Sequence, residues 1–447
     1  MTKKQFRHDF LRGLGSALLE LQSCDNAQKY YDTVHYGCLH VSTYDMQSEG
    51  DRGWYLYTAA AAVGGASILH DIIERYARTF SFYDLFNQLS GILYHYAKEG
   101  STAARNALYE KYSWLIEKLF RSAVSRHRTI FIERSMFEWL CVWLTSLDGF
   151  DAFKRIVMDI SEKLLPKDPV GFFDAWLYSN AQDKFGAKRV ESFLQKQAKK
   201  SAYINIYLQE AHKWDNYVSS KAPDPTLEDV IAEVDGERFH GRGLAMRFAR
   251  NAGMEDLEKL FSLAMEQQDL QSRAELLWGL RRSKLQWPEA VIEELLQSEN
   301  EDIRDTAIYI MEQSPSPKRR EYALKLINEG TDLVDAISIL ALNILPQDEQ
   351  LFCATVKAIP VKLNEGDWHC AFMAAEDALK RLRGKPKTDL LLYIYRETYC
   401  GSCRESIVAL MHKKRALTGS LLQECLYDSN GDIRSFAERV VRREKQS

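Results

Sequence analysis

The chain has 447 residues, of which 46% are apolar and 27% are charged, and its formal net charge at pH 7 is −4. This composition is that of a globular protein, and no segment offers the roughly 18 uninterrupted apolar residues that a membrane-spanning helix needs. The charged N-terminal residues have no apolar signal core behind them, so the sequence predicts a cytoplasmic protein with no membrane partner.

Charge is distributed unevenly along the chain. From Lys380 to Ser447 there are 15 Lys and Arg against 8 Asp and Glu, a net charge of +7. The other residues carry 44 basic against 55 acidic side chains, a net charge of −11. A basic C-terminal end on an acidic body raises the question of a polyanion partner.

Apolar residues recur at three- and four-residue spacing along the chain, which is the period of a helix. Alternating β-branched runs bounded by turn dipeptides are absent, and this argues against an α/β enzyme. The sequence therefore predicts an all-α protein. In the first half we expect helices near residues 5–22, 26–42, 53–78, 82–99, 102–125, 131–147, 150–164, 169–182, 186–199 and 202–218.

The second half contains a recurring marker residue, mostly arginine and mostly spaced by 31 residues. Its members are Arg242, Arg273, Arg304, Asp335, Arg404 and Arg434. The positions three and seven residues after each marker are mostly small or apolar, which indicates one buried face of a repeating helix. The arginine is absent near Trp368, so the unit there is longer or distorted.

Two segments carry a resemblance to a known family. Residues 428–437 read Asp-Ser-Asn-Gly-Asp-Ile-Arg-Ser-Phe-Ala, and residues 298–307 are a near copy with Ser in place of the first Asp. Both resemble the inter-helix turn and second-helix start of a HEAT repeat. The resemblance covers about residues 225–447 and implies an α-solenoid, a superhelix of antiparallel helical hairpins that holds a partner along a concave surface.

The domain boundary is expected in residues 219–226, where two prolines and small polar residues interrupt the helical pattern. Thr226 and Asp229 form a capping-box-like start for the following helix. We expect an N-terminal all-helical domain at residues 1–220, with possibly degenerate repeats, and a HEAT-like repeat array at residues 221–447.

One N-terminal junction mixes His, carboxylate, Arg and aromatic side chains. A functional interpretation places His40, Asp45, Glu49 and Arg52 around a small pocket for a polar ligand or for acid–base catalysis. A structural interpretation makes the carboxylates helix caps, to which Arg52 bridges. The sequence favours the structural interpretation.

Cys400 and Cys403 have the spacing of a redox dithiol or of half a zinc site. A redox pair needs a strand–helix turn, whereas this pair precedes the marker Arg404 at an expected helix–helix junction. Zinc would need two more ligands, and no second closely spaced pair is present. We therefore expect a reduced pair of turn cysteines, with no metal and no cofactor.

Basic side chains cluster toward the C-terminus. If successive repeats place them on one face, they form a ridge for phosphates, and otherwise they are solvated helix ends. These candidate polyanion contacts are Lys380, Arg381, Arg383, Lys385, Lys387, Lys413, Lys414, Arg415, Arg442 and Arg443.

The leading functional hypothesis is a non-catalytic, bacterial-type scaffold or adaptor that binds a protein partner through a concave solenoid surface. The alternative is a nucleic-acid-binding protein of genome defence or repair that uses the basic C-terminal repeats. The third hypothesis is an enzyme with a site near residues 40–52. No catalytic signature supports the third, because the sequence contains no Walker motif, dinucleotide fingerprint or helical His-Glu-x-x-His.

Overall fold

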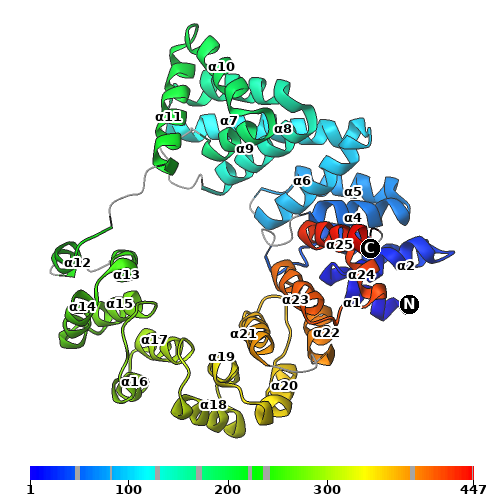
Figure 1. Ribbon diagram of the computed structural model, residues 1–447. Helices are drawn as coiled ribbons and strands as arrows, with labels where there is room; N and C mark the ends of the chain where they lie inside the picture. The colour runs from blue at the N-terminus through cyan, green and yellow to red at the C-terminus, as the bar shows by residue number, and fades with distance from the viewer. Residues whose placement is uncertain are drawn as a thin grey trace. The chain divides into compact units, whose positions relative to one another are not determined.

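The computed structural model is all-α, and the residues that it describes contain no β-strand (Figure 1). It describes residues 1–447 apart from 46–50, 81–82, 126–130, 168–173, 220–223, 235–241, 383–387, 445 and 447. The predicted all-α, solenoid-like fold is confirmed. None of the helices in this described part is both long and apolar enough to cross a membrane.

The chain forms two compact units. Unit 1 comprises Met1–Lys221 and Tyr395–Ser447, and unit 2 comprises Ala222–Ile394. The sequence interpretation had instead placed all of residues 221–447 in one domain. The structure groups the last hairpins with the N-terminal half because the turn after the first helix packs on them: the Ser429 backbone N–H donates to the Gly13 carbonyl at 2.8 Å.

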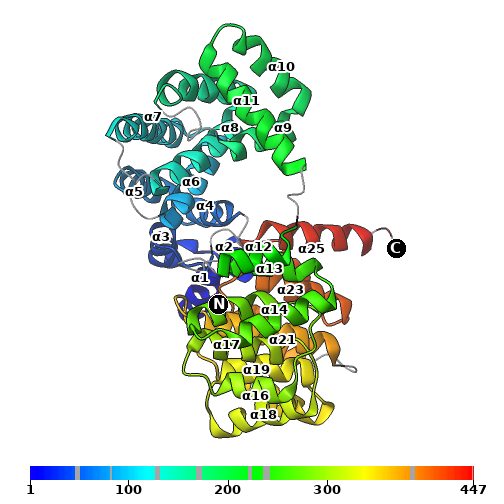
Figure 2. The same ribbon diagram turned by 90° about the vertical axis from the view of Figure 1, so that its left-hand side faces the viewer.

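Unit 1 is built mainly from long, well-buried helices, and Figure 2 shows α7–α11 grouped together at one end of it. The helices are α1 (Lys3–Arg12), α2 (Gly15–Ser23), α3 (Tyr31–Leu39), α4 (Arg52–Ala62), α5 (Gly65–Ala77), α6 (Tyr83–Lys98), α7 (Thr102–Ser125), α8 (Phe131–Asp159), α9 (Ala175–Phe185), α10 (Ala187–Ala198), α11 (Ala202–Ser219), α23 (Gly401–Lys413), α24 (Gly419–Cys425) and α25 (Gly431–Glu444). Short turns of other helix types are η1 (Ala27–Tyr30) and the π-helical η3 (Ile160–Leu164).

Glycines divide the predicted helices of unit 1. The expected helix 5–22 is two helices, because Gly13 adopts φ 79° and ends α1. The expected helix 53–78 is likewise α4 and α5, separated at Gly64 with φ 110°. These left-handed conformations are accessible to glycine at little cost. The expected break between helices 131–147 and 150–164 is present within α8, because Gly149 has the non-helical angles φ 68° and ψ −149°.

Unit 2 is a curved array of helical hairpins (Figure 1). Its helices are α12 (Leu227–Val234), α13 (Arg242–Asn251), α14 (Met254–Glu266), α15 (Leu270–Leu280), α16 (Glu289–Leu296), α17 (Glu301–Met311), α18 (Pro317–Glu329), α19 (Leu333–Asn343), η4 (Pro346–Asp348), α20 (Glu349–Ala358) and α21 (Asp367–Arg381). Helix α22 (Thr388–Glu397) contains the boundary at residues 394 and 395. Each odd-numbered helix from α13 to α21 packs on the next odd-numbered one, and Figure 1 shows them on the inner side of the curve.

The two HEAT-like segments adopt the same local geometry. In both, an asparagine caps the second helix: Asn300 Oδ1 accepts from the Ile303 N–H at 3.2 Å, and Asn430 Oδ1 accepts from the Ile433 N–H at 3.1 Å. In both, the marker arginine donates to the carbonyls six and five residues before it. Arg304 Nη1 reaches those of Ser298 and Glu299 at 2.7 and 3.0 Å, and Arg434 Nη1 makes the equivalent bonds at 2.6 and 3.1 Å. The marker arginine therefore fastens the turn that precedes its own helix.

We expect Asn300→Ala to lower the free energy of unfolding by about 1 kcal/mol, because it removes the side-chain acceptor that caps α17. Glu299→Ala is the matched control, since the Glu299 side chain is exposed and its backbone carbonyl is unchanged. Urea unfolding followed by far-ultraviolet circular dichroism measures both. Equal midpoints for the two variants would contradict a capping role for Asn300.

Candidate functional site

The predicted polar pocket at the α3–α4 junction resolves into separate local roles. His40 ends α3, where its Nδ1 lies 2.9 Å from the Tyr36 carbonyl and its ring stacks on Tyr36. Asp45 is exposed. Burial of Asp84, and secondarily the charge of Asp45, raise the pKa of Asp84. Glu49 lies outside the described residues. His40 and Asp45 therefore have separate contacts and do not form one pocket with each other.

Arg52 is the buried member of that set, with 2% of its surface exposed. Its Nη2 donates to Ser42 Oγ at 2.8 Å and to the Leu11 and Phe10 carbonyls at 3.0 and 3.4 Å. Those carbonyls belong to the last turn of α1, where a cation complements the helix dipole. Arg52 thus holds the end of α1 against the start of α4, a role in folding.

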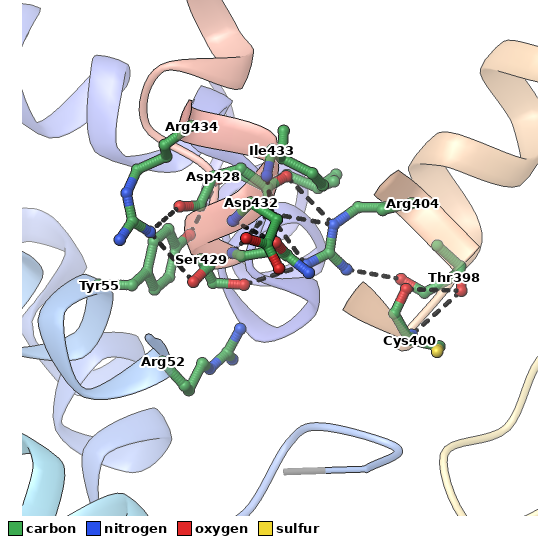
Figure 3. A network of polar contacts seen from close by, with 12 residues as sticks. Arg52, Tyr55, Thr398, Cys400, Arg404, Asp428, Ser429, Asp432, Ile433 and Arg434 are labelled. Atoms are coloured by element: carbon green, nitrogen blue, oxygen red, sulfur yellow. Dashed lines mark hydrogen bonds and ion pairs between the residues drawn. The ribbon is translucent and has the colours of Figure 1, made fainter. Parts of the chain in front are cut away.

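The same region of unit 1 contains a buried ion pair between two C-terminal hairpins (Figure 3). Arg404 and Asp428 are both 0% exposed, and Arg404 Nε and Nη2 each lie 3.1 Å from a carboxylate oxygen of Asp428. Arg404 Nη2 also donates to Ser429 Oγ at 3.0 Å. The marker arginine of α23 is therefore attached to the turn that begins α25.

The C-terminal hairpins also bind the N-terminal helices. Arg434 Nη2 pairs with Asp51 Oδ2 at 2.9 Å, and its guanidinium lies 4.1 Å from the centre of the Trp54 ring. At the other side of the contact, Glu397 pairs with Arg12 and His8, each at 3.1 Å. These partners are far apart in sequence, so their contacts join the N-terminal and C-terminal segments of unit 1.

The paired cysteines are placed at the predicted helix start. Cys400 and Cys403 are buried, reduced thiols at the beginning of α23, and the Cys400 backbone N–H donates to Thr398 Oγ1 at 3.1 Å. This is the local environment of a packed turn.

The basic residues occur in several separate places. Lys380 pairs with Glu376 and Asp377 on its own helix at 2.8 and 3.0 Å, and Arg442 pairs with Glu438 at 3.5 Å. Lys413, Arg415 and Arg443 are exposed and Lys414 is half-buried, while Arg383, Lys385 and Lys387 lie outside the described residues. Arg381 differs from these, because it lines a groove.

That groove lies on the inner side of unit 2 and has a volume of about 560 Å³. Its walls come from the second helices α17, α19 and α21, with Arg282 just after α15. The polar lining comprises Arg282, Tyr309, Glu312, Gln313, Asp335, Ser338, Cys370, Asp377 and Arg381. Met373 contributes an apolar side chain that is 52% exposed.

The groove coincides with the irregular part of the repeat. The marker position is the fourth residue of α15, α17, α23 and α25, and in α21 that position is Cys370. The preceding unit has Asp335 in the marker series. Helix α19, in which Asp335 is the third residue and Ala336 the fourth, and helix α21 thus both lack an arginine at this position, and Asp335 and Cys370 line the groove.

The environment of the groove disfavours the ionised forms of Glu312 and Asp335. Burial raises the pKa of Glu312 to about 7, and the charge of Asp335 contributes in the same direction against a hydrogen bond from Ser338. Burial also raises the pKa of Asp335 to about 6, with further contributions from Asp332, Asp305 and Asp367. This crowding of negative charge would be relieved by a cation.

The surroundings of Cys370 disfavour its thiolate form. Partial burial and the nearby carboxylates Glu312, Asp367 and Asp335 raise the pKa of its thiol. A reactive cysteine requires the opposite shift, because the thiolate is the nucleophile.

Aromatic and guanidinium groups also pack together on α13, α15 and α17, next to the groove residues Arg282 and Tyr309. Arg282 Nε donates to the Tyr309 hydroxyl, and the Arg281 guanidinium lies 4.4 Å from the centre of the Tyr309 ring. Arg242 lies 4.6 Å from the centre of the Trp278 ring and pairs with Asp302 at 3.3 Å. Tryptophan, tyrosine and arginine are the residues that most often dominate binding energy at protein interfaces.

Among the groove residues, the sequence analysis named Arg381, as a polyanion contact, and Asp335, as a marker, but did not predict that they share a groove. Individually, Glu312, Ser338 and Met373 are ordinary helix-face residues, and only the fold brings them together. The one available signal was the interruption of the arginine series at Asp335 and near Trp368. Departures from a local rule are expected at functional positions.

Comparison with known proteins does not add a candidate. No family model, curated protein or solved structure matches the chain.

Proposed function

We propose that the protein is a non-catalytic, cytoplasmic scaffold that binds a Lys- or Arg-rich segment of a protein partner in the inner groove of unit 2. The observation that carries the proposal is the replacement of the marker arginine by Asp335 and Cys370 where the groove lies. The HEAT-like turns support the same class of protein, since helical solenoids generally present extended binding surfaces.

Charge complementarity selects the kind of partner. Glu312 and Asp335 line the groove, and a Lys or Arg side chain beside them would offset the repulsion between the Asp335 charge and Glu312. Arg282 and Arg381 line it as well, so a partner with acidic residues flanking its basic segment would match more of the lining. Tyr309 and Met373 offer apolar contact area for the aliphatic stem of a bound basic side chain.

The first test uses a short Lys- and Arg-rich peptide carrying a fluorophore, an acidic peptide of the same length, and a short DNA duplex. We expect the basic peptide to bind most tightly in fluorescence anisotropy. The double variant Glu312→Gln/Asp335→Asn should weaken that binding at least about tenfold, equivalent to about 1.4 kcal/mol. The matched control is Glu255→Gln/Asp256→Asn, which removes the same charge from exposed positions of α14.

Other outcomes distinguish the competing hypotheses. Equal loss of peptide binding in both double variants would indicate a nonspecific charge effect and contradict the groove. Tight DNA binding that is lost when Lys413, Arg415 and Arg443 are changed to Glu would support the nucleic-acid function instead. Affinity purification from nuclease-treated and untreated native lysate then identifies the partner: a stoichiometric protein retained in both halves is the expected result.

A further inference from the structure

A second cavity lies in unit 1, between α5 and α7, and does not belong to the groove described above. Its volume is about 190 Å³, and three aromatic side chains, Tyr76, Phe80 and Trp114, contribute to its walls together with Lys111. An apolar cavity of about 150 Å³ is sufficient for a benzene-sized molecule. The space therefore fits a ligand with a single six-membered ring and a small substituent.

Lys111 gives this aromatic cavity a buried cation. Only 5% of its surface is exposed, and its Nζ lies 5.3, 4.5 and 5.1 Å from the ring centres of Tyr76, Phe80 and Trp114. Nζ donates to the carbonyls of Ala77 and Thr79 at 3.0 and 3.3 Å. An ammonium has three N–H groups, and within the described residues two of them have backbone acceptors, at the end of α5.

The charges around Lys111 favour an anion. Within the described residues no carboxylate forms an ion pair with Lys111, although a buried lysine is usually paired. Burial, and secondarily the charge of Lys118, lower the pKa of Lys111 to about 8. Lys118 itself pairs with Glu133 at 2.7 Å, and the other charged residue of the lining, Glu110, is exposed. Among the residues that the structure describes, the groups in contact with the buried ammonium are thus neutral carbonyls and aromatic rings.

We propose that this cavity binds a small aromatic carboxylate, whose ring packs against Phe80 and Trp114 and whose carboxylate pairs with the Lys111 ammonium. The ligand supplies both features that the cavity lacks: apolar volume to fill it and a negative charge beside Nζ. A neutral aromatic molecule would supply only the first, and an aliphatic anion only the second. This proposal concerns unit 1 alone and does not depend on the function proposed for unit 2.

The test compares phenylacetate with its neutral amide, 2-phenylacetamide, by isothermal titration calorimetry at pH 7 with the full-length protein. We expect phenylacetate to bind at least about tenfold more tightly. At pH 8.5 its binding should take up protons, because the carboxylate stabilises the charged form of Lys111; two buffers with different ionisation enthalpies reveal this uptake. Equal affinity for the two ligands, or no binding of either, would overturn the proposal without any variant being needed.

Variants then assign the effect to the cavity. Lys111→Met should abolish the preference for the carboxylate, whereas Lys118→Met should keep it, although Lys118 also lies 4.8 Å from the Trp114 ring centre. Ala107→Leu fills the cavity and should weaken both ligands. Thermal unfolding confirms that each variant is folded, and preserved phenylacetate preference in folded Lys111→Met would place the site elsewhere.

Discussion

Replacement of Arg404 by methionine is expected to lower the free energy of unfolding by about 3–5 kcal/mol, because it removes one partner of a buried ion pair. Methionine fills much of the volume but leaves the Asp428 carboxylate without its counter-charge in a fully buried position. It also removes the bond to Ser429 Oγ. The midpoint of urea unfolding, followed by far-ultraviolet circular dichroism, measures the effect.

Arg304→Met is the matched control for Arg404. Arg304 occupies the same marker position but donates to the neutral carbonyls of Ser298 and Glu299, so its loss should cost about 1–2 kcal/mol. Adding Asp428→Asn to Arg404→Met should recover part of the stability, because the neutral amide no longer needs a buried cation. The contradicting result would be that Asp428→Asn lowers the free energy of unfolding by the same amount in the Arg404→Met background as in the wild type. That result would show that the two residues are not energetically coupled.

The sequence carried most of the information about helices because helix periodicity and capping are local. Asn300 and Asn430 occupy equivalent positions in the two HEAT-like segments, and both cap the helix that follows. What was missed depends on contacts between distant segments. Nothing near Gly13 in the sequence shows that Ser429 packs on it, or that the final hairpins therefore join the N-terminal unit.

Side-chain chemistry was harder to infer than secondary structure. Arg52 stood beside His40 and Asp45 in the sequence, but its side chain turns to the carbonyls of Phe10 and Leu11. Conversely, Lys111 and Trp114 are three residues apart on an ordinary amphipathic helix, and only the packing of α5 against α7 makes them the lining of a cavity. Burial and tertiary neighbours decide such roles, and neither can be read from residue type.

Glu312→Gln is expected to stabilise the protein at pH 8 by about 2–3 kcal/mol, a size that follows from the difference between a pKa of about 7 and one of 4.5. The folded protein binds this proton more tightly than the unfolded chain does. The penalty for ionising Glu312 is therefore fully present above pH about 7, falls as the pH falls, and disappears below about 4.5. The free-energy difference between variant and wild type should thus be largest at pH 8 and small at pH 5.

Asp348 provides a control of opposite sign. A hydrogen bond from Arg320 lowers the pKa of Asp348, so ionisation of this carboxylate favours the folded state, and Asp348→Asn should destabilise the protein at pH 8. A Glu312→Gln variant that is no more stable than wild type at pH 8 would show that Glu312 ionises without penalty.

The affinity for a basic peptide should rise with pH, whereas the ionisation of Glu312 lowers the stability of the fold as the pH rises. A bound cation favours the ionised forms of Glu312 and Asp335, so wild-type affinity should rise between pH 5 and pH 8 and protons should be released on binding. The Glu312→Gln/Asp335→Asn variant should lose that pH dependence along with its affinity. The empty, ionised groove lowers the stability of the fold, and a bound cation restores it. This is the behaviour expected of a binding surface.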